Sequence, residues 1–326
     1  MSYTLRKITA AIMPLLMIMI YCSQGVYASP PNFDGSLCEA SNQLLTCSGR
    51  GFLTADLLYW KAYEGGLNFC GSNKSKDEVK TNGEVVSTIK ARRNDPQFQW
   101  SPGFRIGMGY AFARNCWDIA AYWTHFRSHA HAKGRNDEQK FRWKLDFEVV
   151  DLLIGYEYNI FPCFTLRPFG GMRAARIDQT ARTTQFTRSS GSSSSYSAMD
   201  WRHQKATLSA IGPLVGIDAG WRLKYGFILY ANSAISCLYG DFNVKTQEYE
   251  RFSHGTNFCY LRQHLHACQA VVDTSLGIRW ERCFCNDMQL MIGLGLEQHR
   301  YCDHNRIGDY GDLCLQGVTF SAGIEF

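Results

Sequence analysis

Hydrophobic and polar residues alternate along the last nine positions of the sequence. The apolar positions are Val318, Phe320, Ala322, Ile324 and Phe326. The positions between them carry small or polar side chains. A period of two places all the apolar side chains on one face of a β-strand and the small, polar ones on the other. This segment is therefore predicted to be a strand that lies between two different environments.

The same alternation recurs along the chain and is cleanest between Trp100 and Phe112. There the large apolar side chains share one face, and Gly, Ala and Arg105 occupy the other. This distribution is typical of barrel strands that separate lipid from a wet lumen. In total the pattern predicts ten strands, at 52–63, 100–112, 117–123, 141–158, 164–177, 211–221, 227–239, 272–280, 288–296 and 318–326.

The longest predicted strand, 141–158, changes phase in its middle. Apolar residues stand at odd positions from Phe141 to Val149, and at even positions from Val150 onward. Because a slip of one residue exchanges the two faces of a strand, we expect a β-bulge near Val149 and Val150. A strand this long exceeds the roughly 3–10 residues usual in soluble sheets, which favours a strand that crosses a bilayer obliquely.

The connections between the predicted strands alternate between two lengths. Short turns fall near 113–116, 159–163, 223–226 and 281–287, whereas long polar loops are expected at 65–97, 127–140, 178–205, 240–266 and 302–314. This alternation is how outer-membrane barrels are built. The sequence therefore predicts an all-β fold, a transmembrane antiparallel up-and-down β-barrel of about ten strands, with short periplasmic turns and long extracellular loops. A final aromatic residue such as Phe326 is typical of the strand that closes such a barrel.

The first residues have the features of an export signal. Arg6 and Lys7 precede an apolar stretch at 8–20 that is too short to span a bilayer, and small residues follow at 26–28. A lipid attachment site at Cys22 is the weaker interpretation, because the bulky Tyr21 precedes it. We expect a cleaved signal peptide at 1–28, a periplasmic N-terminal arm at 29–50 and the barrel at 51–326, integral to a bacterial outer membrane.

Composition agrees with a membrane barrel, and we expect no nucleic acid as a partner. Aromatic residues make up 14% of the chain and glycine is abundant at 29 residues, which suits strands with aromatic girdles and small inward positions. The formal charge of +5 is too small to indicate nucleic-acid binding.

Charged residues on the polar faces of the predicted strands are candidates for lining a pore. They are Arg105, Asp146, Glu148, Asp151, Glu157, Arg173, Asp218, Arg222, Asp273, Arg279 and Glu297. Opposed basic and acidic rows would screen solutes by size and charge. The other interpretation is a salt-bridged plug that closes the barrel, because ten strands lie between filled small barrels and open porins.

The thirteen cysteines of an exported chain indicate disulfide bonds. Cys302 and Cys314 face the same side of adjacent predicted strands, and closing the loop between them would contribute about 3 kcal/mol. The other disulfide candidates are Cys259, Cys268, Cys38 and Cys47. Short turns at separate positions cannot all reach one another, so cross-links between molecules are expected from Cys116, Cys163, Cys283 and Cys285.

No metal, cofactor or catalytic site is predicted. Cys283 and Cys285 lack a second pair of ligands at the spacing that zinc sites need. The histidines at 125, 129, 131, 264 and 266 could bind a metal at the bases of loops, but scattered surface histidines are the commoner case. A barrel protease would need an acid and a base above the bilayer, and the only local group is Asp303-His304 with Asp309 and Asp312, all in one loop.

Several short motifs resemble a known family. They are Leu58-Tyr59-Trp60, the stretch at 166–173, the stretch at 211–216 and Leu238-Tyr239-Gly240. They are similar to the pore-forming, major-outer-membrane-protein-like family of chlamydia-type and legionella-type bacteria. The resemblance implies a β-barrel pore of the outer membrane, and cysteine-rich relatives that are cross-linked into the envelope by disulfides. Ten strands would make this pore narrower than a general porin of 16 strands.

The expected function is passive diffusion of small hydrophilic solutes or ions, combined with a structural role in a disulfide-cross-linked cell envelope. The expected partners are outer-membrane lipid, the solutes, and further copies or other cysteine-rich envelope proteins. Three alternatives stay open. One is a surface adhesin or structural barrel with a closed lumen, one is an outer-membrane barrel protease, and one is a secreted β-sandwich held by disulfides.

Overall fold

The computed structural model describes residues 49–67, 74–81, 84–91, 96–112, 116–133, 139–190, 195–252, 255–284, 288–307 and 310–326. The expected signal peptide and nearly all of the expected arm lie outside the described residues. Among the described helices, none is long and apolar enough to cross a membrane.

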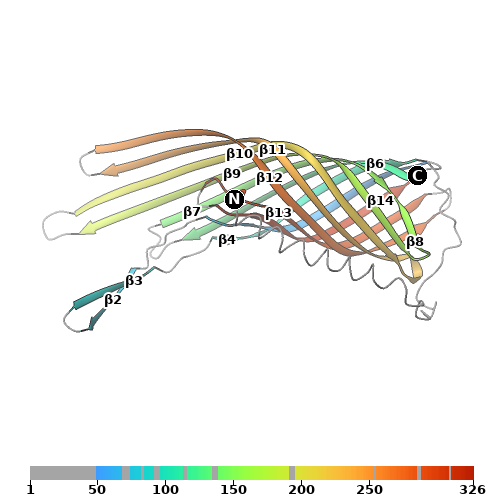
Figure 1. Ribbon diagram of the computed structural model, residues 1–326. Coiled ribbons are helices and arrows are strands. Elements are labelled where there is room, and N and C mark those ends of the chain that lie inside the picture. Colours follow the sequence, from blue (N-terminus) through green and yellow to red (C-terminus); the bar gives the residue numbers. More distant parts are fainter. Residues whose placement is uncertain are drawn as a thin grey trace. The chain divides into compact units, whose positions relative to one another are not determined.

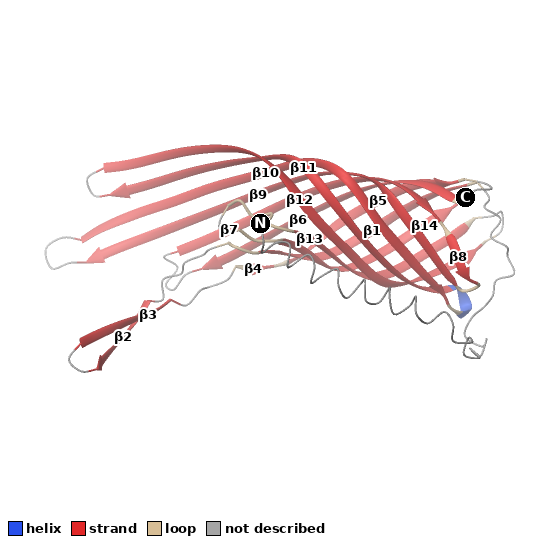
Figure 2. Cartoon of the chain, in the orientation of Figure 1, coloured by secondary structure: helices blue, strands red, loops and turns tan. Residues whose placement is uncertain are grey.

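Ten antiparallel strands form the wall of a closed barrel (Figures 1 and 2). Each strand pairs with the next, and the last pairs with the first, so the described wall has no open edge. The predicted fold is confirmed. The strands are β1 (Arg50–Glu64), β5 (Trp100–Ala111), β6 (Trp117–Lys133), β7 (Gln139–Tyr156), β9 (Phe164–Ser190), β10 (Ser195–Arg222), β11 (Phe227–Phe252), β12 (Gly255–Cys283), β13 (Gln289–Tyr301) and β14 (Leu313–Glu325).

The C-terminal strand closes the barrel as its alternation predicts. β14 pairs with β1 from Phe52 opposite Glu325 to Glu64 opposite Leu313. Backbone hydrogen bonds of 2.9 Å in both directions join Gly51 and Phe326 beyond the end of the ladder. Hydrocarbon offers no partner to backbone N–H and C=O groups, so this last pairing is what makes a spanning sheet possible.

Four short strands and one 3₁₀ helix among the described elements are not part of the ten-stranded wall. β2 (Lys74–Thr81) and β3 (Glu84–Ala91) form a hairpin within the segment expected to be a loop at 65–97. β4 (Gln97–Phe98) pairs with β6, and β8 (Tyr158–Phe161) pairs with β9. The turn between β10 and β11 is the short 3₁₀ element η3 (Lys224–Gly226).

Four strands are much longer than the sequence predicts. β9, β10, β11 and β12 contain 26 to 29 residues each, and they extend as two hairpins past the ends of the other strands (Figure 1). The loops expected at 178–205 and 240–266 are therefore wrong, because most of their residues belong to paired strands. Likewise, β6 and β7 continue into the polar stretch at 127–140. Serine, threonine and charge indicated a loop, but a hairpin in water needs no apolar face.

The β-bulge expected in β7 is also absent. The pairing of β7 with β6 and with β9 runs without a break, with Val149 opposite Thr124 and Val150 opposite Trp123. Phe147 and Val149 point into the barrel and are 3% and 4% exposed, whereas Val150 points outward and is 48% exposed. What changes at this point is the surroundings of the wall. The outer face is apolar where the wall lies in the membrane, and the inner face is apolar where the wall extends beyond the membrane.

An apolar belt surrounds the barrel where it meets lipid. Every wall strand contributes exposed, outward-facing apolar side chains to it, represented in strand order by Leu57, Ile106, Trp123, Leu152, Met172, Val215, Ile235, Leu276, Leu294 and Phe320. Aromatic residues mark the outer edge of the belt, where Tyr59 stacks on Trp100 with ring centroids 5.4 Å apart. Such girdles are typical of outer-membrane barrels.

A substitution on the outer face of β7 tests this change of surroundings. Leu152→Arg places a charge in the apolar belt, and we expect it to lower the free energy of unfolding by about 2–4 kcal/mol. Lys144→Leu, on the same face of the same strand but beyond the belt, should change it by less than about 0.5 kcal/mol. Denaturant titration of the barrel in lipid vesicles measures both, and equal effects would contradict the assignment of the belt.

Candidate functional site

A chain of ion pairs crosses the interior of the barrel. At one end, Arg105 of β5 lies between two carboxylates. Its Nη1 is 3.3 Å from Oδ2 of Asp56 on the neighbouring β1, and its Nη2 is 2.8 Å from Oε2 of Glu297 on β13. Because β1 and β14 separate β5 from β13 in the sheet, the pair with Glu297 reaches across the lumen.

The chain continues through a histidine to the opposite wall. His299 contacts Glu297 through Nε2 at 3.3 Å and Asp273 through Nδ1 at 2.8 Å. Asp273 in turn accepts a hydrogen bond of 2.5 Å from Arg173 of β9, and the same guanidinium donates to Asp151 of β7 at 2.7 Å. Arg173 and Asp273 are 6% and 5% exposed, so these charges are withdrawn from water.

Most members of this ion-pair chain were predicted from the sequence, but two were not. Arg105, Asp151, Arg173, Asp273 and Glu297 were candidates, and the structure brings all five together. Asp56 and His299 were missed. Asp56 stands on the inward face of β1, where alternation is interrupted by Leu58 and Trp60. His299 lies beyond the strand predicted at 288–296, whereas the observed strand β13 continues to Tyr301.

A second cluster lies nearer the short turns. Arg167 of β9 donates from Nε to Asp118 of β6 at 2.7 Å and from Nη1 to Asp218 of β10 at 2.6 Å. Asp218 also accepts a hydrogen bond from Asn232. Asp218 was a candidate, whereas Arg167 and Asp118 were not. Arg167 thus links β6, on one side of β9, to β10 on the other.

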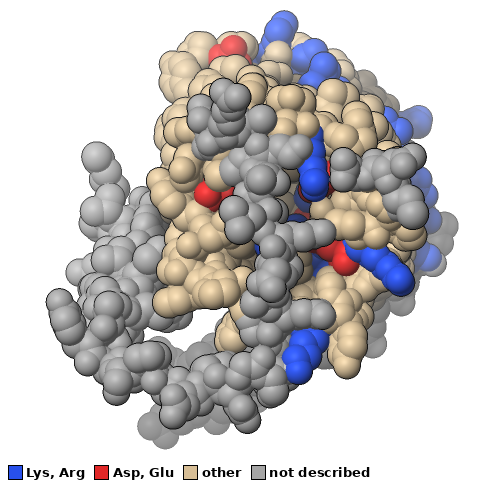
Figure 3. Space-filling view, turned by 90° about the vertical axis from the view of Figure 1, so that its right-hand side faces the viewer, with Lys and Arg blue, Asp and Glu red and all other residues tan. Residues whose placement is uncertain are grey.

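The remaining inward candidates lie at the ends of their strands. Arg279 pairs with Glu281 at 2.6 Å, and Arg222 lies 3.8 Å from Glu157. Figure 3 views the face toward the short turns, where basic and acidic side chains lie close together near the middle of the described surface. Arg279, Glu281, Arg222 and Glu157 thus lie at the end of the barrel toward the short turns, apart from the central ion-pair chain.

Asp146 and Glu148 do not line the lumen. They alternate with the buried Phe147 and Val149, so they lie on the outer wall of β7. Asp146 pairs there with Arg127 at 3.0 Å and Glu148 with His125 at 3.4 Å. Polar residues were assigned to the inner face throughout, and this assignment fails beyond the membrane because the outer wall there meets water.

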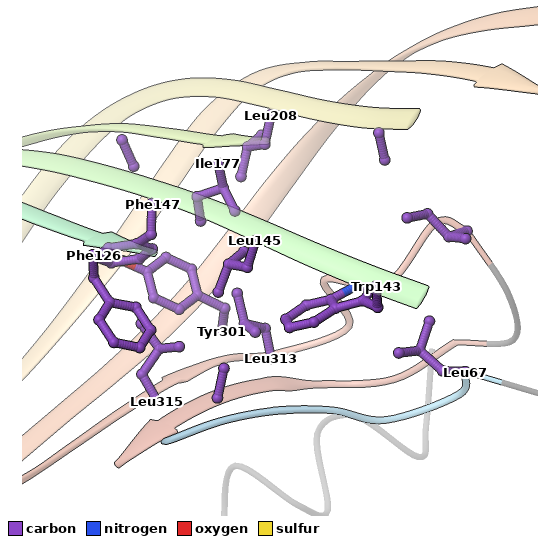
Figure 4. Close-up of a cluster of buried hydrophobic side chains, with 14 of the residues drawn as sticks. Leu67, Phe126, Trp143, Leu145, Phe147, Ile177, Leu208, Tyr301, Leu313 and Leu315 are labelled. Carbon is purple, nitrogen blue, oxygen red and sulfur yellow. The ribbon is translucent and has the colours of Figure 1, made fainter. Parts of the chain in front are cut away.

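Above the ion pairs, apolar side chains fill the interior. One buried cluster includes Leu58, Trp60, Phe126, Trp143, Leu145, Phe147, Ile177, Leu208, Leu238, Phe242, Val271, Tyr301, Leu313 and Leu315. These residues come from all the wall strands except β5, and Figure 4 shows side chains from different strands pointing toward one another. An open lumen in a barrel of ten strands would leave such side chains accessible to water. The outer half of the lumen is therefore closed.

The connection from β13 to β14 completes this closure. His304, Asn305 and Ile307 are buried at 3%, 1% and 8% exposure. Asn305 donates a hydrogen bond of 2.7 Å to the carbonyl of Gly65, and Gln204 donates one of 3.0 Å to the carbonyl of Ile307. We call the described part of this connection, residues 302–307, the mouth segment. It packs inside the barrel at the long-loop end, although the sequence predicted a long polar loop at 302–314.

The histidine of the candidate protease group is buried within the mouth segment. The ring of His304 packs against Phe242 and Tyr301, with centroids 5.6 and 6.0 Å away. Burial, with a smaller contribution from Arg306, lowers the pKa of His304 to about 3, so its imidazole stays neutral. Asp312 is held by Arg300 at 2.5 Å, and Asp309 lies outside the described residues.

Comparison with known proteins identifies the family. The family model described as the Legionella pneumophila major outer membrane protein precursor matches residues 47–321. The chain belongs to this family. It is an outer-membrane β-barrel protein, and the resemblance inferred from its motifs is confirmed. No curated protein matches the sequence.

Solved structures of other outer-membrane barrels align with this Legionella-family barrel. The outer membrane protease OmpT of Escherichia coli has 13% identity and a TM-score of 0.44, over 88% of this chain and 99% of that one. The transport unit of the autotransporter AIDA-I from E. coli has 10% identity and a TM-score of 0.33, over 92% and 93%. A major outer membrane protein from Thermus thermophilus has 9% and 0.35, over 86% and 100%.

The cysteines of the family barrel fall into two groups. Cys116 and Cys163 are each disulfide-bonded, so they are not available for cross-links between molecules. Within the described ranges, six others carry free thiols, namely Cys237, Cys259, Cys268, Cys283, Cys302 and Cys314. Cys38, Cys47 and Cys285 lie outside the described residues.

Two of the free thiols approach each other closely. The Sγ atoms of Cys237 and Cys268 are 2.8 Å apart on the outer wall of β11 and β12. Cys259 lies on the same extended strand as Cys268, about 30 Å away at roughly 3.3 Å per residue, so those two cannot bond to each other. Cys302 and Cys314 carry free thiols in the structure, and the bond between them stays a prediction.

Removing one member of the central ion-pair chain tests its role in the family barrel. Arg105→Met leaves Asp56 and Glu297 as buried, uncompensated carboxylates, and we expect the free energy of unfolding to fall by about 3–5 kcal/mol. Arg127→Met breaks an exposed pair of the same kind and should cost no more than about 1 kcal/mol. Denaturant titration in vesicles measures both. Equal losses would show that the central charges are not buried in the folded protein.

Proposed function

We propose that this member of the Legionella major outer membrane protein family is a gated channel for small ions and hydrophilic solutes. The observation that carries the proposal is the position of the mouth segment, which lies inside the barrel and completes an apolar closure above a charged lumen. Passage would require this segment to move, whereas the strands of the wall would keep their pairing.

The charged lumen supports a channel rather than a barrel that is permanently closed. Buried ion pairs seldom stabilise a protein more than well-packed apolar residues of similar volume would. Stability alone therefore gives no reason for the chain from Asp56 to Asp151 at the centre of the barrel. Rings of charged side chains are a common means of selecting ions, and apolar constrictions above them close pores by excluding water.

A few hydrogen bonds, rather than a strand ladder, tie the mouth segment to the wall, and one of them joins the backbone N–H of Cys302 to the carbonyl of Ala270 on β12 at 2.9 Å. Besides the bonds from Asn305 and Gln204, the side chain of Gln269 donates to the carbonyl of Cys302. Such a segment separates from its site at lower cost than a strand of the wall does. The narrow ten-stranded wall would then admit small solutes and exclude bulky ones.

Planar-bilayer recordings of the refolded protein test the gate and the selectivity. Ile307→Ser weakens the apolar contact of the mouth segment, and we expect it to raise the time-averaged conductance above that of the wild type. Arg279→Ser removes a positive charge at the short-turn end of the lumen while acidic groups remain, so ion selectivity should shift toward cations. Arg127→Ser, on the outer wall, is the matched control and should change neither quantity.

Absence of conductance in every variant would contradict the channel. It would favour the alternative of a surface or structural barrel with a closed lumen. Exposed apolar residues near the tip of the β11–β12 hairpin support that alternative, since Phe258, Tyr260 and Leu261 are 63%, 52% and 49% exposed. Exposed apolar patches often mark contact surfaces.

We also propose a structural role through disulfide bonds between molecules, which the exposed thiols of Cys283 and Cys259 support. Cys283 ends β12 at the side of the short turns, the expected periplasmic side, where envelope components would meet it.

Non-reducing gels of purified envelopes test this role. The wild type should migrate as high-mass species that reducing agent converts to monomer. Cys283→Ser should diminish these species, whereas Cys268→Ser, whose thiol already faces Cys237 in the same molecule, should leave them. A monomer under both conditions would exclude the cross-link.

A further inference from the structure

Two histidines and a carboxylate come together on the outer wall of the β11–β12 hairpin. Asp241 of β11 lies directly opposite His266 of β12, and His264 stands two residues farther along β12 on the same face. The neighbouring Phe242 and Val244 are buried inside the barrel, so the three polar side chains point outward into water. Pairing of the two strands therefore creates a group that the sequence spreads over 26 positions.

The three side chains offer their ligand atoms to a common point. One atom from each of Asp241, His264 and His266 lies within 4.8 Å of the others. Nδ1 of His266 contacts Oδ1 of Asp241, and the rings of His264 and His266 meet edge to face with centroids 5.4 Å apart. Tyr239 lies parallel to His266 at 6.4 Å and an interplanar angle of 13°. Contacts within the protein thus orient the rings.

We propose that Asp241, His264 and His266 bind a divalent transition-metal ion of the Zn²⁺ class. Imidazole nitrogen and carboxylate oxygen are the ligands that Zn²⁺ binds at about 2.0–2.2 Å, and harder ions such as Ca²⁺ and Mg²⁺ require more oxygen ligands than this group has. Small rotations of exposed side chains bring the ligand atoms to the separations that one ion needs. Three protein ligands leave a fourth position for water or another oxygen ligand.

The position of the site gives it access from outside the cell envelope. Asp241 and His266 line a groove on the outer wall that also includes Ile211 and Tyr239. The site therefore stands just beyond the outer edge of the apolar belt. This binding is independent of passage through the lumen, and failure of either proposal leaves the other intact.

A second group on the outer wall has a related arrangement. His125 of β6 lies opposite Glu148 of β7, and Asp146 stands two residues farther along β7. There, however, Arg127 already donates a hydrogen bond of 3.0 Å to Asp146. A cation at this second group would compete with the guanidinium, so the group with two histidines is the stronger candidate.

The nearby thiols are the competing explanation for any metal bound here. Cys268 follows His266 on the same face of β12 and contacts Cys237. Thiolates bind Zn²⁺ readily, so an experiment has to separate them from the histidines. Cobalt makes the separation possible, because Co²⁺ bound by thiolate has an intense sulfur-to-metal absorption that Co²⁺ bound by imidazole and carboxylate lacks.

Titration of the full-length refolded protein with Zn²⁺ in detergent micelles, followed by calorimetry, tests the proposal. We expect a saturable site whose affinity falls by at least about tenfold in His264→Ala and in His266→Ala, which corresponds to about 1.4 kcal/mol of binding free energy. Asp241→Asn should weaken binding in the same direction. Co²⁺ should bind to the wild type without the sulfur absorption.

Matched variants complete the experiment. His129→Ala removes an exposed histidine from the same outer wall that belongs to neither group, and it should leave the affinity unchanged. Heat-modifiable migration on gels confirms that each variant is folded. Unchanged affinity in the two histidine variants would overturn the proposal. So would loss of the site in a Cys237→Ser, Cys268→Ser double variant that keeps both histidines.

Discussion

The structure depends on the requirement that every backbone polar group inside a membrane find a partner within the protein. A sheet meets this requirement only when its last strand pairs with its first, and here β14 pairs with β1 along nearly their entire lengths. Closure gives the sheet one inner face and one outer face, and the alternation of each strand is fixed relative to these two faces. Adjacent residues of a strand then face opposite sides of the wall. The side that each residue faces decides whether it meets the lumen, lipid or water.

Surroundings change along the strands while the alternation does not. β7 shows this most clearly, because its outward positions pass from Lys144 in water to Leu152 in the apolar belt without any break in pairing. The inner face changes in the opposite sense, from Trp143 in the buried cluster to Asp151 in the ion-pair chain. The barrel thus has two interiors in series, one apolar and one charged. The channel that we propose would use the apolar part as its gate and the charged part as its filter.

The outer parts of the long strands obey a different rule from the parts in lipid. Beyond the belt, water on the outside makes polar outward residues acceptable, so functional groups can gather there without loss of stability. Pairing in register then brings Asp241 to His266, and the hairpin supplies a rigid support for exposed ligands. The same freedom allows the exposed apolar residues at the tip of the hairpin, which no requirement of the membrane explains.

The sequence by itself determined the barrel, its ten strands, the closing role of β14 and the inward position of Arg105, Asp273 and Glu297. It could do so because hydrocarbon demands an apolar outer face, so polarity there reveals orientation. Where both sides of the wall can be polar, the sequence carried no such signal, and Asp146, Glu148 and the long hairpins were misassigned. Only the tertiary structure decided which charges meet across the lumen and that the mouth segment lies inside. Those contacts join strands that are not neighbours, and no pattern along a single strand encodes the distance across a closed barrel.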